Sequence, residues 1–284
     1  MAALPPYTTL FERIWHYAFR VICGLILFFL IMPILVIIPL SFNAGDYFTF
    51  TKEMLALDPA GYSLQWYHDF FTNPNWQGAV RNSVIISIFS TLIATTLGTL
   101  AALGLSQAQM PAKSAIMALL LSPMIVPLII SAAGMYFFYS RVGLQGTLIG
   151  VILAHAALGT PFVVITVTAT LVGFDRSLIR AALGLGASPF TVLRRVIVPI
   201  ILPGVISGAL FAFITSFDEV VVVLFVGSFE QRTIPWQMFS GIREHISPTI
   251  LAVATVLVWV SIVLLTVLEL LRRRSERLRG VAAN

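Results

Sequence analysis

Two adjacent acids, Asp218 and Glu219, are the side chains of this sequence whose type and position could act most directly on a solute. They stand between two apolar runs, and a charge at the centre of a bilayer costs on the order of 2.5–3.5 kcal/mol or more. A carboxylate pair attracts an ammonium group, and the rings of Phe217 and Trp66 offer cation–π faces to the same kind of cation. We therefore expect these four residues to lie along a path for a cationic solute.

Two other roles for the acids remain open at this point. A straight helix that begins at Val196 and rises about 1.5 Å per residue brings Asp218 roughly 33 Å along its axis. The acids could therefore lie at the outer interface, where water solvates them. They could also form structural ion pairs with Arg232 or Arg243.

The other reactive side chains show no spacing that is typical of a catalytic or metal site. The single cysteine, Cys23, lies in an apolar run, and the histidines lack metal-ligand spacing. His155 could bond a neighbouring helix or line the solute path, and we expect the packing role. Neither lysine follows the glycines of a phosphate-binding loop, so we do not expect this chain to hydrolyse ATP, and we expect no cofactor. The residues concerned are His16, His68, His155 and His245, and Lys52 and Lys113.

A basic, partly polar segment from Arg180 to Pro203 interrupts two long apolar runs. Its residues 181–185 form a short apolar helical face, and glycines at 184 and 186 can end that helix. Ser188 followed by Pro189 is typical of the start of another helix. A short helix bordered by arginines suits insertion into a groove of a cytoplasmic subunit. The prolines Pro199 and Pro203 either kink the following span or are simply tolerated there.

These segments must be positioned by membrane helices. Hydrophobic residues make up 58% of the chain and charged residues 10%, against about 25% charge in soluble domains. The apolar runs are continuous rather than alternating, which excludes transmembrane strands. We predict an all-α membrane protein whose six transmembrane helices each have the roughly 20 apolar residues that a span requires. The predicted spans are approximately 19–41, 82–104, 114–138, 146–172, 197–216 and 249–271.

Basic residues set the expected orientation, because they are retained on the cytoplasmic side. With the N and C termini cytoplasmic, twelve of the seventeen lysines and arginines lie inside. The expected organisation is a cytoplasmic surface helix within 1–18, a transmembrane domain over 19–271 with a cytoplasmic coupling loop at 173–196, and a basic tail at 272–284. We expect the tail to anchor the chain to membrane lipid. The excess of basic residues is explained without a nucleic-acid partner.

An outward-facing loop of about forty residues, from Asn43 to Arg81, is rich in aromatic and acidic side chains. Tryptophan and tyrosine are enriched where a membrane meets water, so this loop could be an interfacial belt. It could instead receive a soluble partner or line the outer entrance of the path.

The basic segment resembles the signature of binding-protein-dependent ABC importer permeases, which is Glu-Ala-Ala, three residues, Gly, nine residues, Ile, one residue and Leu-Pro. The matching positions are Arg180-Ala181-Ala182, Gly186, Val196 and Val198-Pro199. Arg180 departs from the pattern, because the family usually has an acid there. The resemblance continues along the chain, most closely to the polyamine subgroup, at Ser41-Phe42-Asn43, Trp66-Tyr67, Phe70-Phe71, Asn82-Ser83, Gly173-Phe174-Asp175 and Ser216-Phe217-Asp218-Glu219.

This resemblance implies the fold of a type I ABC importer permease in the bacterial inner membrane. Its implied partners are a dimer of ATP-binding subunits, a second permease that is a distinct chain, and a periplasmic substrate-binding protein. It implies a transport subunit rather than an enzyme, which moves putrescine or spermidine inward by alternating access. The implied ATPase-coupling residues are Arg180, Ala181, Ala182, Gly186, Ala187, Ser188 and Pro189.

Other functions remain open. Related permeases carry opines, GABA-like amines or other small solutes. A self-sufficient secondary transporter would be expected to show inverted repeats with midplane charges in both halves, and the sequence has one such acid cluster. An intramembrane enzyme that acts on lipid phosphates would be expected to show a cytoplasmic cluster of Asp, His and Lys, and the sequence shows none.

Overall fold

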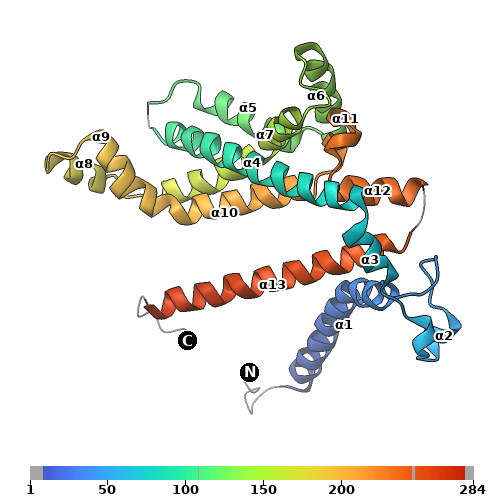
Figure 1. Ribbon diagram of the computed structural model, residues 1–284. Coiled ribbons are helices and arrows are strands. Elements are labelled where there is room, and N and C mark those ends of the chain that lie inside the picture. The colour runs from blue at the N-terminus through green and yellow to red at the C-terminus, as the bar shows by residue number, and fades with distance from the viewer. Residues whose placement is uncertain (1–8, 108, 245–246, 279–284) are drawn as a thin grey trace. The chain divides into compact units, whose positions relative to one another are not determined.

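The computed structural model describes residues 9–107, 109–244 and 247–278, and within these ranges the regular elements are helices, joined by loops and accompanied by an isolated bridge between Asn43 and Tyr62 (Figure 1). The chain divides into two compact units. One comprises Met1–Thr72 and Glu244–Asn284, and the other comprises Asn73–Arg243. The first eight residues of the predicted surface helix and the last six of the predicted basic tail lie outside the described residues.

The first unit contains two long helices and a loop with short helices. Its first helix is continuous across the predicted surface helix and the predicted first span, and a capping box between Thr9 and Glu12 begins it. The last helix packs against α3 and α1, and its Thr249 hydroxyl donates to Asp69 Oδ2 at 2.8 Å. The elements are α1 (Leu10–Leu40), α2 (Lys52–Leu55), η1 (Pro59–Gly61), α3 (Gln65–Thr72) and α13 (Thr249–Leu278).

The second unit is built on three long helices that pack side by side: α4 (Pro74–Leu105), α7 (Leu148–Val172) and α10 (Val198–Phe217). Small residues lie where these helices cross. A Cβ atom added at Gly208 would lie 2.8 Å from the Val163 Cα, and one added at Gly98 would lie 2.7 Å from the Val163 Cβ. Lipid supplies no hydrophobic force between helices, so such close backbone packing stabilises the bundle.

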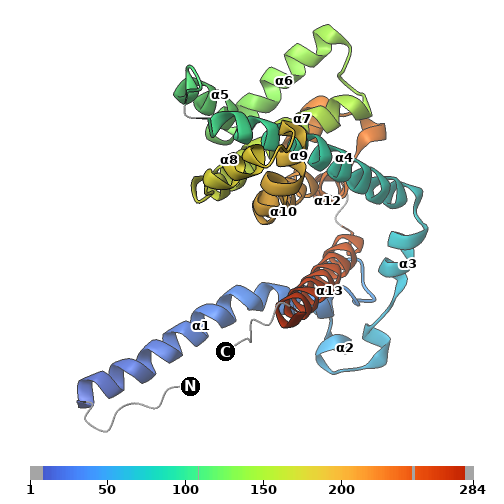
Figure 2. The ribbon, with the colours of Figure 1, turned by 90° about the vertical axis from the view of Figure 1, so that its left-hand side faces the viewer.

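The predicted third span at 114–138 is not a single helix, so the expectation of one helix there was wrong, while the crossing itself stays a prediction. The segment forms α5 (Lys113–Ile125) and α6 (Leu128–Val142), which are bent by 104° relative to each other (Figure 2). Val126 between them is extended, with φ −70° and ψ 134°, because a residue that precedes proline disfavours the helical region. Pro127 therefore sets the break.

Four described helices are long and apolar enough to cross a membrane, and the bent pair could supply a fifth span. Three of them are α1, α4 and α7, and the fourth runs from Pro189 to Phe217. Helix α13 has a shorter apolar stretch, Thr249–Val263. The count of six spans and the orientation of the termini remain predictions. The remaining elements are α8 (Ser177–Gly184), α9 (Pro189–Val192), the π-helical turn η2 (Leu193–Ile197), α11 (Val221–Val226), η3 (Phe229–Gln231) and α12 (Ile234–Glu244).

Candidate coupling segment and solute path

The coupling segment, residues 173–196, begins with a helix that Asp175 caps. The Ser177 amide donates to Asp175 Oδ1 at 2.8 Å, and the Ser177 hydroxyl donates to Oδ2 at 2.6 Å. The hydroxyl bond is the chief reason that the pKa of Asp175 lies below its ordinary value. The charged carboxylate thus fixes where α8 starts.

Gly186 ends α8 through its backbone conformation. Its φ is +82°, in the left-handed region that favours glycine. The Gly186 amide donates to the Leu183 carbonyl at 2.9 Å, and the Ala187 amide donates to the Ala182 carbonyl at 3.1 Å. This pair of bonds defines a Schellman motif. A Cβ added at Gly186 would meet no atom of this chain within 4 Å, so its backbone conformation, rather than a close contact within the chain, requires glycine.

The next helix begins as the sequence indicates. The Ser188 hydroxyl accepts the Thr191 amide at 3.3 Å, and Pro189 occupies the first turn of α9. Residues 180–189 therefore form one helix, a tight turn and the start of a second helix. All the expected coupling residues belong to this unit of structure.

The turn presents large apolar side chains to the outside of the unit. Leu185 is 89% exposed and Phe190 is 71% exposed, and Leu183 is 46% exposed. Arg194 and Arg195 follow and are also exposed. We call Leu183, Leu185 and Phe190 the apolar turn surface.

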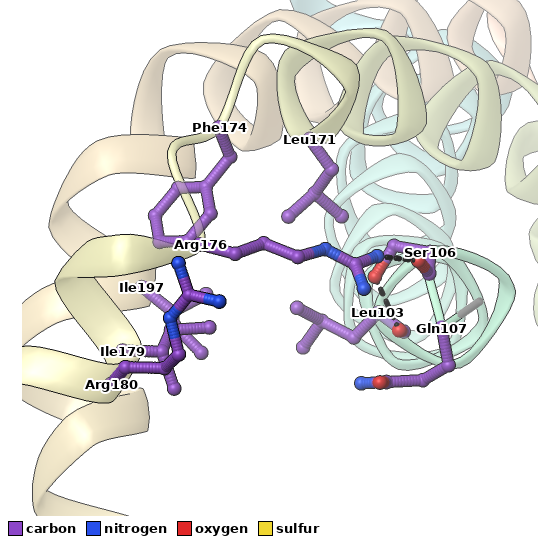
Figure 3. A pocket seen from close by; sticks show the side chains of 9 residues that line it. All are labelled: Leu103, Ser106, Gln107, Leu171, Phe174, Arg176, Ile179, Arg180 and Ile197. Carbon is purple, nitrogen blue, oxygen red and sulfur yellow. Dashed lines mark hydrogen bonds between the residues drawn. The ribbon is translucent and has the colours of Figure 1, made fainter. Parts of the chain in front are cut away.

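Arg180 lies apart from the apolar turn surface and lines a pocket of about 290 Å³ above α8 (Figure 3). Arg176 reaches across this pocket and donates to the Ser106 carbonyl at the end of α4. Nothing in the sequence links position 176 to position 106, so sequence reasoning missed both the pocket and this connection. The lining residues are Leu103, Ser106, Gln107, Leu171, Phe174, Arg176, Ile179, Arg180 and Ile197.

A π-helical turn, η2, joins the coupling segment to α10. It ends two residues before Pro199, whose ring nitrogen cannot donate a helical hydrogen bond. Single π turns in α-helices often mark functional sites and accompany kinks. The irregular backbone therefore lies at 193–197, directly before the proline that the sequence singled out.

The two acids at the other end of α10 have different surroundings. Asp218 follows the last residue of the helix and is exposed. Glu219 is 8% exposed and accepts the Val222 amide at 2.9 Å, so it caps α11. A hollow of about 300 Å³ is lined by Ile214, Thr215, Asp218 and Glu219.

The arginines that could have paired with the acids are engaged elsewhere. Arg232 donates to the Phe229 carbonyl and to Gln237 Oε1, and its guanidinium lies 3.3 Å from the centre of the Phe229 ring. The Arg243 Cζ atom lies 5.5 Å from the centre of the Phe239 ring. Within the described residues the acids thus form no ion pair with either arginine.

The two aromatic residues that were predicted with the acids belong to different units. Phe217 stacks on Phe213, with ring centres 5.8 Å apart. Trp66 belongs to the first unit, where its indole N–H donates to the Asn43 carbonyl at 2.7 Å. The common path for these residues stays a prediction.

A polar network that the sequence did not reveal lies next to the acids. His155 Nδ1 lies 2.9 Å from the Ser216 hydroxyl, which accepts the Ser90 hydroxyl at 2.8 Å. The three residues come from α7, α10 and α4, and all are buried. The expectation that His155 contacts a neighbouring helix is confirmed, and the shared Ser216 ties three helices together two residues before Asp218.

Residues 94–279 match the model of the family described as binding-protein-dependent transport system inner membrane component. The spermidine/putrescine transport system permease protein PotC of Haemophilus influenzae is 32% identical over 248 residues, which are 87% of this chain and 93% of that protein. PotC of Escherichia coli strain K12 is 31% identical, with 86% and 90% covered. The putrescine transport system permease protein PotI of the same strain is 28% identical, with 81% of each chain covered.

Solved structures share the fold. A chain of a bacterial ABC transporter involved in the import of the acidic polysaccharide alginate superposes with a TM-score of 0.71 at 16% identity, over 93% of this chain and 99% of that chain. A chain of the MetNI methionine ABC transporter gives a TM-score of 0.53 at 21% identity, over 72% and 95%. The chain therefore belongs to the family of binding-protein-dependent transport system inner membrane components, and it is a permease, a transport subunit of an ABC importer rather than an enzyme.

Proposed function

We propose that this chain is one of two distinct permease subunits of an ATP-driven polyamine importer in the bacterial inner membrane. Putrescine or spermidine is handed over by a periplasmic binding protein, and the path then opens alternately to the two sides. The names of the relatives, PotC and PotI, support the choice of a polyamine.

The observation that carries the proposal is the geometry of the coupling segment. Its turn is fixed by backbone hydrogen bonds, and it presents the apolar turn surface to the outside. Exposed apolar patches of this kind mark sites where a partner binds. We assign this surface to a dimer of ATP-binding subunits, with Ala181, Ala182 and residues 186–189 shaping the contact.

The proposed conformational change follows from how the coupling segment is connected to α10. When the ATP-binding subunits close, the coupling segment moves with them, and η2 passes the displacement into α10. The far end of α10 carries Phe217 and is followed by Asp218, whose exposed carboxylate attracts the ammonium groups of the solute. One helix thus connects the ATPase contact to the solute path.

Reconstitution tests this function directly. The chain is placed in proteoliposomes with its second permease, the ATP-binding subunits and the binding protein, and uptake of labelled putrescine is measured. We expect uptake only with ATP and all partners present. Uptake by the chain alone would instead indicate a secondary transporter. A competition assay with excess opine or GABA tests the other solutes, and undiminished putrescine uptake would exclude them as competitors.

A further inference from the structure

The pocket above α8 is lined by apolar and basic side chains, and the Arg176 side chain extends across it toward Ser106 (Figure 3). Leucine and isoleucine side chains from α4, α7, α8 and η2 form its apolar wall. Arg176 and Arg180 supply its positive charge, and Gln107 adds an amide. The apolar residues are Leu103, Leu171, Ile179 and Ile197.

Arg176 is held in place at this pocket. Its guanidinium donates to the Ser106 carbonyl at the end of α4, where a helix leaves carbonyls without intrahelical partners and its dipole favours a positive charge. A guanidinium carries five N–H donors, so others stay available after this bond is made. The bond therefore positions the charge without using up its donors.

Arg180 adds a second positive charge four residues further along, on the same face of the chain. Asp175 lies near enough to Arg180 for the arginine charge to contribute to its lowered pKa, but both oxygens of this carboxylate are bonded to Ser177. One acid does not neutralise two arginines. The pocket thus keeps an excess of positive charge beside an apolar wall.

A phosphate group attached to an apolar body fits this combination. Guanidinium groups bind phosphate oxygens through paired N–H donors, and the apolar wall suits a glycerol or acyl portion. Free inorganic phosphate makes no use of that wall. The volume of about 290 Å³ is at the low end of ligand pockets, so it suits a headgroup with the first part of its chains.

We propose that the pocket binds the headgroup of an anionic phospholipid, with Arg176 and Arg180 as its phosphate ligands. Basic pockets between membrane helices bind such headgroups on the cytoplasmic side. Because the pocket lies between the end of α4, the end of α7 and α8, the lipid stabilises the coupling segment against the long helices. This regulation by lipid rests on the proposed coupling role of the segment, whereas the binding itself does not.

Lipid retention by the full chain tests the binding. The protein is purified in detergent with equal amounts of phosphatidylglycerol and phosphatidylcholine, and retained lipid is counted by native mass spectrometry. We expect selective retention of phosphatidylglycerol. Arg180→Gln should lower it about fivefold, which corresponds to the roughly 1 kcal/mol that one basic residue contributes near anionic lipid. Arg176→Gln with Arg180→Gln should lower it further.

The matched control is Arg194→Gln with Arg195→Gln, which removes the same charge from positions that are exposed like Arg176 and Arg180 but do not line the pocket. Its phosphatidylglycerol retention should stay within about twofold of the wild-type value, because salt screens the attraction between the lipid and exposed charges that do not contact it. Equal losses in the two double variants, or unchanged retention in the pocket variant, would overturn the proposal. Displacement of the lipid by inorganic phosphate at equal concentration would also overturn it, since the apolar wall would then contribute nothing.

A further measurement separates this site from an ATPase contact. If Arg180 instead meets an acid of the ATP-binding subunit, Arg180→Gln reduces co-purification of that subunit and leaves lipid retention unchanged. That outcome would reject the lipid site and retain the proposed function. Conversely, lipid selectivity without ATP-dependent uptake would reject the proposed function and retain the site.

Discussion

At the scale of single residues, Gly186 is distinguished by its backbone conformation and Asp218 by its exposed charge. Gly186 is required by its conformation, because its φ of +82° is strained for any residue with a Cβ. Asp218 is available for its charge, because it is exposed whereas its neighbour Glu219 caps α11. Gly186 can therefore be compared with Gly184, which is helical, and Asp218 can be compared with the buried Glu219.

Gly186→Asp should weaken ATPase coupling, because the left-handed conformation costs a residue with a Cβ roughly 1–2 kcal/mol and the turn loses its shape. Gly184→Ala is the matched control, since Gly184 is helical and an added Cβ there meets no atom within 4 Å. Co-purification of the ATP-binding subunit and solute-stimulated hydrolysis report the effect. The same result for both variants would remove the turn from the coupling mechanism.

Asp218→Asn should lower putrescine uptake per assembled complex and leave thermal stability unchanged, because only an exposed charge is removed. Glu219→Ala should lower stability by about 1 kcal/mol, the cost of losing a helix cap. Uptake into proteoliposomes and thermal unfolding of the purified complex separate the two effects. Normal uptake by Asp218→Asn would exclude this carboxylate from the solute path.

At the scale of elements, the sequence predicted the long apolar helices and the end of one helix and start of another within the coupling segment. Positions such as Gly186, Ser188 and Pro189 act through local backbone rules, which is why their roles could be inferred. The break at Val126 was missed because the apolar run across it is continuous and hydropathy does not detect a bend. The Arg176–Ser106 and His155–Ser216 contacts join distant positions, and no local pattern encodes them.

The packing of α10 on α7 gives a prediction at this scale. Gly208→Ala should destabilise the bundle by 1–3 kcal/mol, the usual range for overpacking, because the new Cβ would lie 2.8 Å from the Val163 Cα and backbone cannot move aside locally. Gly134→Ala in α6 is the control, since its Cβ meets no atom within 4 Å. Thermal unfolding of the two variants should differ clearly, and equal midpoints would contradict this packing.

At the scale of the whole molecule, the predicted topology assigns each loop to a side of the membrane. The described helices include four candidate spans and a bent pair, so the number of crossings is the quantity to measure. The single cysteine makes this convenient, because Cys23→Ser gives a background without thiols. Positions on opposite sides can then be labelled one at a time.

On this background, Lys52→Cys should react with a membrane-impermeant maleimide added to intact spheroplasts. Arg194→Cys should react only after the membrane is opened, because the positive-inside rule places it in the cytoplasm. Mass tagging on a gel quantifies both reactions. The predicted topology separates the two positions by an odd number of membrane crossings. Labelling of both positions in sealed cells would contradict it.

The Schellman turn at Gly186 has a consequence for how such permeases can diversify. Its two defining hydrogen bonds join main-chain atoms, so they do not depend on the identity of the side chains that the turn displays. The side chains of Leu183, Leu185 and Phe190 can consequently be exchanged without altering the backbone conformation of the turn. Under the proposed function, substitutions at a few exposed positions would therefore change the choice of ATP-binding partner and leave the backbone turn as it is.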